Sequence, residues 1–134
     1  MSWWVSLLDQ SSPAECGYGL GDEACPAPCY PAFRCEPFED GGTFILGGSG
    51  ECCLNITYNY SRFYYRELDG ENGLRAMDGE KAGEWIARLA GAVEKLGTRR
   101  DENYWAATEG NAGAALSLLL AWARAYPQGV WRVA

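Results

Sequence analysis

Two β-prone runs separated by a glycine-rich turn, within residues 41–61 (GGTFILGGSGECCLNITYNYS), constrain the fold more than any other feature of the chain. The runs cover residues 43–46 and 52–57, and the turn between them reads GGSG at positions 47–50. Because glycine supplies the positive φ that tight turns require, this order predicts a β-hairpin. The second run ends in a polar cluster that consists of Asn55, Thr57, Asn59, Tyr60 and Ser61.

The second half of the chain predicts two long helices. Residues 79–96 carry one apolar stripe at helical spacing, with Asp78 as the expected N-cap and Gly97 as the stop. Residues 109–126, capped by Thr108, are apolar on more than one face, so this helix should be the more buried of the two. Residues 61–68 are expected to form a short helix capped by Ser61, although their tyrosines are also compatible with a continued strand.

Added to strands at residues 3–8 and 130–133, these elements predict an α+β fold. We expect a small, mostly antiparallel sheet, made of the N-terminal strand, the hairpin and the C-terminal strand, with the three helices packed on it. A chain of 134 residues with 48% hydrophobic content should form one domain, residues 1–134. Residues 10–40 differ in kind, because they hold five of the six prolines and four cysteines without apolar periodicity. We expect this segment to be a long loop or insertion.

The cysteines of this segment are candidate metal ligands. Cys16, Cys25, Cys29 and Cys35 follow the spacing C-x8-C-x3-C-x5-C. Zinc binds four thiolates tetrahedrally, and a segment without a core of its own gains most from a structural metal. We therefore expect one structural zinc, with disulfides or unmodified thiols as the alternatives. The N-terminus lacks the pattern of a secretory signal, which favours a reducing cytoplasmic location and metal over disulfides.

Charge and composition exclude several classes of function. A net charge of −7 with only two lysines argues against binding to a nucleic-acid backbone, and no apolar run is long enough to span a membrane. The absence of histidine excludes Ser–His and Cys–His catalysis and a His-ligated catalytic zinc. No other catalytic set stands out, so we expect a binding protein rather than an enzyme.

Two groups of residues are candidate ligand contacts. Asn55, Thr57 and Asn59 would share one face of a strand and could satisfy the hydrogen bonds of a ligand, with Tyr60 as a further contact. The alternative is that Asn59 and Ser61 cap the following helix while Asn55 bonds a neighbouring loop.

The second group lies at the start of the second long helix and consists of Tyr104, Trp105, Thr108 and Asn111. Helix N-termini favour anions such as phosphate, and Trp105 could stack on a flat ring. The alternative is an aromatic contact that fixes the start of the helix, with Thr108 as its cap.

Several motifs resemble those of a family of small uncharacterised proteins encoded by bacteriophages and found in metagenomic sequences. The matching pieces are MSWWVSL at the N-terminus, GGTF at 41–44, GG at 47–48, LNITYNYS at 54–61, YW at 104–105 with Thr108, GNA at 110–112 and PQGVW at 127–131. The resemblance covers most of the chain outside residues 10–40. It implies a place in the cytoplasm of an infected bacterial host but no particular activity. The cysteine segment departs from the family pattern, which looks shorter and lacks this cysteine set, so the zinc site is expected for this chain alone.

These observations give two leading hypotheses of function, with a hydrolase or transferase as the third. The first is a phage-type accessory protein, acting in counter-defence, that binds a small polar and nucleotide-like ligand in one cleft formed by both polar groups. The second is a protein–protein interaction module, or an inhibitor of a host protein, stabilised by a zinc-bound cysteine loop.

Overall fold

A four-stranded antiparallel sheet organises the protein. The structure, a computed structural model, describes residues 1–11, 29–31, 43–45 and 52–134. The strands are β1 (Ser2–Leu8), β2 (Thr43–Ile45), β3 (Cys53–Thr57) and β4 (Val130–Val133), in the order β2-β3-β1-β4. The two predicted hairpin strands, β2 and β3, pair antiparallel, and the N- and C-terminal strands pair with each other. The turn predicted at 47–50 lies outside the described residues.

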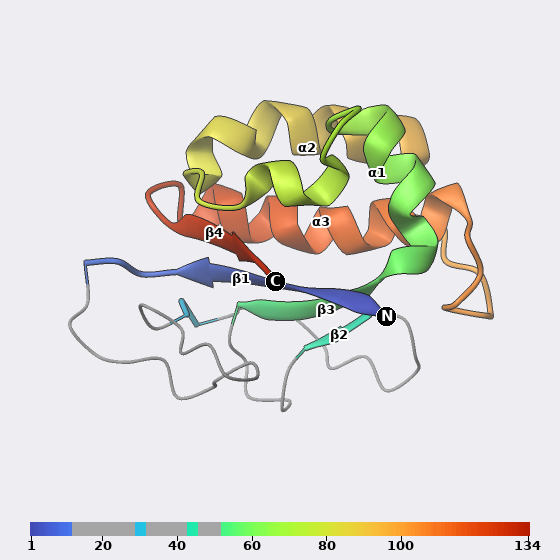
Figure 1. Ribbon diagram of the computed structural model, residues 1–134, viewed down its shortest axis with the longest axis horizontal. Helices are drawn as coiled ribbons and strands as arrows, with labels where there is room; N and C mark the ends of the chain where they lie inside the picture. Colours follow the sequence, from blue (N-terminus) through green and yellow to red (C-terminus); the bar gives the residue numbers. More distant parts are fainter. Residues whose placement is uncertain (12–28, 32–42, 46–51) are drawn as a thin grey trace.

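The helices gather on one side of this sheet (Figure 1). They are α1 (Ser61–Glu67), α2 (Ala82–Leu96) and α3 (Glu109–Ala125), with two 3-10 helices, η2 (Tyr58–Tyr60) and η3 (Gly73–Met77). The long helices α2 and α3 pack against each other. The predicted α+β class, with two long helices and one short helix on a small sheet, is confirmed.

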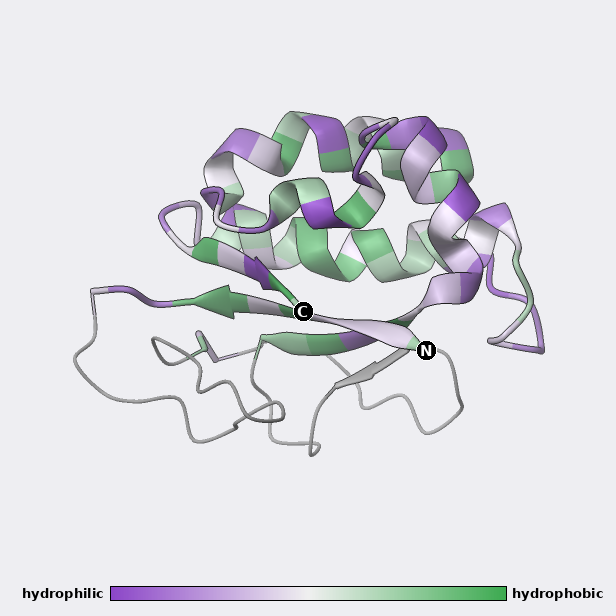
Figure 2. Ribbon diagram, viewed as in Figure 1, coloured by the Kyte–Doolittle hydropathy of each residue, from purple (hydrophilic) through white to green (hydrophobic). Residues whose placement is uncertain are grey.

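The core lies between the sheet and the helices. On β1, Trp3, Val5 and Leu7 alternate with Trp4, Ser6 and Leu8, and only the first set joins the hydrophobic core. Their cross-strand partners on the same face are also core residues: Ile56, Leu54, Trp131 and Val133. Ten of the 17 residues of α3 are buried against five of the 15 in α2, which confirms that α3 is the more buried helix. Figure 2 shows this difference in hydropathy: α3 is mostly hydrophobic, whereas α1 and α2 carry hydrophilic residues on their outer turns.

The start of α2 differs from the prediction. The helix begins at Ala82, and Asp78 does not cap it, because its Oδ1 accepts the N–H of Val133 at 2.9 Å. Residues 79–81 run along β4 instead: Gly79 donates to the carbonyl of Trp131 at 2.8 Å, and Trp131 donates to that of Glu80 at 2.9 Å. This pairing covers the outer edge of β4, where unpaired backbone groups would otherwise be open to another chain.

Of the caps predicted for the other two helices, one is confirmed and one is wrong. Thr108 is the N-cap of α3, as predicted, and its Oγ1 accepts the N–H of Asn111 at 3.1 Å. The prediction that Ser61 caps α1 is wrong. Tyr60 occupies the N-cap position but its side chain makes no capping bond to the helix, and the Ser61 hydroxyl donates to the carbonyl of Tyr58.

Candidate functional site

The polar side chains of β3 are buried within the protein. Asn55 is 5% exposed and Thr57 is 1% exposed. The Nδ2 of Asn55 donates to the Ser2 hydroxyl at 2.7 Å, and the Oγ1 of Thr57 accepts the N–H of Asn59 at 3.2 Å. Both positions pair with Trp4 and Ser2 of β1, on the face turned away from the core. These side chains therefore support the sheet and the turn that follows it.

Asn59 does not continue the strand face that the sequence suggested. The strand ends at Thr57, and the 3-10 helix η2 turns Asn59 out to the surface. From there its Nδ2 donates to the carbonyl of Trp105 at 2.8 Å. The next residue, Tyr60, is 1% exposed and its hydroxyl donates to the carbonyl of Tyr104. The two groups of predicted site residues, far apart in sequence, thus meet at the loop formed by residues 97–108, which we call the 97–108 loop.

A single buried amide organises the 97–108 loop from inside. Asn111 is 3% exposed, although it lies in the first turn of α3. Its Oδ1 accepts the N–H of Asp101 at 2.9 Å, and its Nδ2 donates to the carbonyls of Asn103 at 3.1 Å and Ala106 at 3.0 Å. These three bonds use most of the hydrogen-bonding capacity of the side chain. Asn111 therefore holds the loop on the helix.

Two glycines allow the loop to approach α3 closely. A Cβ atom at Gly110 would lie 1.8 Å from the carbonyl oxygen of Arg99, and one at Gly113 would lie 1.8 Å from that of Gly97. Both positions therefore require glycine for contact between backbone and helix. This contact between the loop and α3, which we call the seam, explains the sequence GNAG at 110–113. The two glycines leave room for the backbone of the loop, and the amide of Asn111 between them forms hydrogen bonds with it.

The N-terminus of α3 is occupied by groups of the protein itself. Thr108 caps one N–H, and the carbonyl of Arg99 lies against Gly110. Glu109, in the first turn, places a carboxylate near the positive end of the helix dipole and pairs with Arg66 at 2.8 Å. Because a carboxylate repels a second anion, this geometry favours the structural interpretation of Thr108 over a phosphate site.

Trp105 is the part of the 97–108 loop that faces solvent. The residue is 52% exposed, while its backbone N–H donates to the Oδ1 of Asn103 at 3.1 Å and its backbone carbonyl accepts a hydrogen bond from Asn59. The backbone is thus fixed on both sides of an exposed indole ring. Asn59 donates to the carbonyl of Trp105 and Arg62 to that of Ala107 in the same loop, and we call Asn59, Arg62 and Trp105 the Trp105 surface. Sequence reasoning missed Arg62, because only the fold brings α1 beside this loop.

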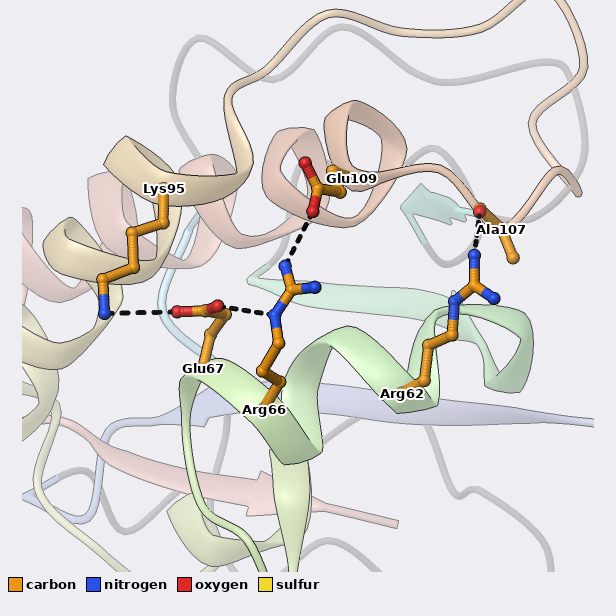
Figure 3. A network of polar contacts seen from close by, with 6 residues as sticks. All are labelled: Arg62, Arg66, Glu67, Lys95, Ala107 and Glu109. Carbon is orange, nitrogen blue, oxygen red and sulfur yellow. Dashed lines mark hydrogen bonds and ion pairs between the residues drawn. The ribbon is translucent and has the colours of Figure 1, made fainter.

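An ion-pair network lies next to the Trp105 surface (Figure 3). Arg66 pairs with Glu67 at 2.7 Å and with Glu109, and Lys95 pairs with Glu67 at 3.5 Å. The hydrogen bond from Arg66, with the attraction of Lys95, lowers the pKa of the Glu67 carboxyl. Arg62 takes no part in this network and donates instead to the carbonyl of Ala107 at 3.1 Å.

Of the four predicted zinc ligands, only Cys29 lies among the described residues. Cys16, Cys25 and Cys35 lie outside them. Cys29 is half-buried and forms an isolated bridge with Leu8 at the end of β1. The following Tyr30 stacks on Tyr126 with ring centroids 4.2 Å apart, which anchors residues 29–31 on the fold. No group of three potential metal ligands is found within the described ranges. The zinc site stays a prediction.

A shallow hollow of about 220 Å³ lies elsewhere, at the edge of β4, and is lined by Leu8, Gln10, Asp78, Gly79, Val130, Trp131 and Arg132. It includes none of the predicted ligand contacts. In the part of the chain that the structure describes, no helix is both long and apolar enough to cross a membrane.

Comparisons of the chain with protein-family models, with curated proteins and with solved structures found no match. The functional argument therefore depends on the chain's own residues.

Proposed function

We propose that this protein is a protein–protein interaction module whose contact surface is the Trp105 surface. The observation that carries this proposal is an indole ring 52% exposed on a loop whose backbone is fixed by Asn59, Asn103 and Asn111. Trp and Arg dominate the binding energy of many protein interfaces. A contact residue held in place before binding loses less conformational entropy when the complex forms.

The internal bonds of the predicted ligand contacts support this choice over a small-molecule site. Asn55 and Asn111 are buried and bonded within the protein, so neither amide is available to a ligand in this conformation. Small-molecule sites are concave and bury most of their ligand, whereas Trp105 projects from a surface loop. The resemblance to phage-encoded proteins supports a host protein as the partner, with inhibition or counter-defence as the role.

The test compares protein capture by three forms of the chain in a bacterial lysate: wild type, Trp105→Ala and Tyr65→Ala. Tyr65 is a matched control, because it is the other exposed aromatic ring among the described residues, at 44%, and lies on α1. We expect a specific partner to be retained by wild type and Tyr65→Ala and lost from Trp105→Ala. Equal capture by all three forms, each folded by circular dichroism, would contradict the proposal.

A second candidate is a flat polar ligand that stacks on Trp105. The observation that favours it is the hydrogen bond between Asn59 and the Trp105 carbonyl, which brings members of both predicted groups to one surface. Stacking of a base on an aromatic side chain contributes about 1–3 kcal/mol. ATP, GTP and a cyclic dinucleotide should then raise the thermal midpoint of wild type and leave that of Trp105→Ala unchanged. The interaction module predicts no shift with any of the three.

A further inference from the structure

We propose that the partner contributes an acidic peptide segment, with a carboxylate that binds Arg62 beside the side chains that cover Trp105. This inference rests on the proposed function, because it names the chemistry of the partner at the Trp105 surface.

Arg62 is bonded to the loop that carries Trp105. Its guanidinium lies 4.7 Å from the centroid of the Phe63 ring and donates to the carbonyl of Ala107 at 3.1 Å, two residues beyond Trp105. Asn59, three residues before Arg62, bonds the carbonyl of Trp105. The start of α1 and the 97–108 loop are thus joined by two hydrogen bonds, and Arg62 and Trp105 are exposed residues of these two joined segments.

The charge of Arg62 is not matched by a carboxylate within the described residues, whereas that of its neighbour is. One turn further along α1, Arg66 forms ion pairs with Glu67 and Glu109. Figure 3 shows Arg62 apart from this network, pointing at a backbone carbonyl. That carbonyl takes one of the five guanidinium N–H groups and does not neutralise the charge. The planar fork of arginine fits a carboxylate with two parallel hydrogen bonds, so a partner carboxylate completes the site.

The remaining charges favour a peptide carboxylate over a phosphate polymer. Nucleic-acid binding depends on several cations meeting several phosphates, and a chain of net charge −7 repels a polyanion. Glu109 also occupies the nearby N-terminus of α3, where a phosphate would otherwise bind. Within the described residues, Arg62 has no carboxylate partner and is bonded to the loop that exposes Trp105. This pair of residues corresponds to a short segment that contains an Asp or Glu and an apolar residue.

The test selects binders from a displayed library of random 12-residue peptides with the wild-type protein. The affinities of the selected peptides are then measured by fluorescence polarisation for wild type, Arg62→Gln, Arg66→Gln and Trp105→Ala. Selected peptides should be enriched in Asp or Glu, and Arg62→Gln should weaken them about ten-fold, the loss expected for one charge-assisted hydrogen-bonded contact. Arg66→Gln, whose charge is already paired, should change affinity by less than about three-fold. Replacing the peptide carboxylate by its amide should weaken binding to wild type and have no further effect on Arg62→Gln.

The outcomes separate this inference from the proposed function. Loss of binding in Trp105→Ala with full binding in Arg62→Gln would overturn the acidic partner and leave the interaction module standing. Unchanged binding in both variants would overturn both proposals. A selection without acidic enrichment or without any binder would overturn the acidic segment. Binding of a dT12 oligonucleotide that depends on Arg62 and Trp105 would also overturn it, because the partner would then be a nucleic-acid strand.

Discussion

At the scale of single residues, the fold of the Trp105 surface depends on side chains that do not themselves face solvent. Asn111 and Tyr60 are buried and donate hydrogen bonds to carbonyls of the 97–108 loop, whereas Trp105 of the same loop is exposed. Tyr104 and Thr108 are half-buried within the same assembly. The polar residues that marked this region as a ligand site are therefore mostly the supports of one exposed ring.

Replacing Asn111 tests this division of roles. Asn111→Ala removes three hydrogen bonds and leaves the N–H of Asp101 without its partner, while the carbonyls of Asn103 and Ala106 keep their bonds from the N–H groups of Ala106 and Thr108. We expect the free energy of unfolding to fall by about 1–3 kcal/mol, measured by urea denaturation. Asn59→Ala is the control, because Asn59 is exposed and its single bond lies at the surface, so its loss should cost under about 1 kcal/mol. Equal losses in the two variants would contradict the assigned role of Asn111.

Tyr64 gives a prediction about pH. The residue is fully buried, and its hydroxyl donates to the carbonyl of Ala112 at 3.0 Å. Burial, with repulsion from Tyr60, raises the pKa of the Tyr64 hydroxyl well above its usual value near 10. The folded protein therefore keeps this proton while the unfolded chain loses it, and stability falls as pH rises above about 10. Urea midpoints at pH 8 and pH 10.5 should show this fall, and Tyr64→Phe should show a smaller one from a lower starting value. An equal fall in Tyr64→Phe would assign the effect to other groups.

At the scale of elements, local patterns predicted what depends on local chemistry. The apolar stripes gave both long helices, and Thr108 was correctly placed as the cap of α3. The errors occur where backbone distant in sequence competes for the same hydrogen bonds. Residues 79–81 pair with β4, so α2 starts three residues later than the expected cap at Asp78 suggested. Asp78 likewise bonds Val133 instead of the helix. No periodicity reveals such pairing, because the partner lies some 50 residues away in sequence.

Glycines within the two long helices offer a matched test of the seam between α3 and the 97–108 loop. A Cβ atom added at Gly91 of α2 would meet no other atom within 4 Å, whereas a Cβ at Gly113 of α3 would collide with the carbonyl of Gly97. Gly91→Ala should therefore stabilise the protein by about 0.5–1 kcal/mol, the usual gain in a helix interior. Gly113→Ala should instead cost about 1–3 kcal/mol, since backbone must move to relieve the overlap. Thermal and urea unfolding of both variants measure the difference, and a stabilised Gly113→Ala would show that the loop does not lie where the structure places it.

At the scale of the whole molecule, the sequence indicated which polar and aromatic residues could contact a ligand, but not which of them the fold buries and bonds within the chain. Asn59 and Trp105 do meet, as the shared-site hypothesis required, although 46 positions separate them. The same hypothesis assigned Asn55 and Asn111 to a ligand, and the fold gives both amides partners within the chain. A side chain's partners follow from the tertiary arrangement, so the sequence alone could not separate supports from contacts. Arg62 illustrates the converse, since its place at the 97–108 loop follows from the fold rather than from any motif.

The last prediction concerns the composition of the intact protein. We expect one zinc per chain, held by Cys16, Cys25, Cys29 and Cys35, because four thiols fall within a segment that lacks an apolar pattern. Native mass spectrometry of protein purified without chelators should show the mass of one zinc, lost on acidification as the thiolates take up protons.

Cys29→Ala should abolish zinc binding, while the far-ultraviolet circular dichroism of the helices stays close to that of wild type, because their core residues lie elsewhere. Cys53→Ala is the control: this cysteine is 2% exposed on β3, accepts a hydrogen bond from Ser6 and is not among the four, so its loss should leave the metal bound. A wild-type mass without zinc, or one reduced by the hydrogens lost in disulfide formation, would contradict the zinc site. It would not contradict the Trp105 surface, since the bonds by which Asn59, Arg62 and Asn103 hold that surface do not involve a cysteine.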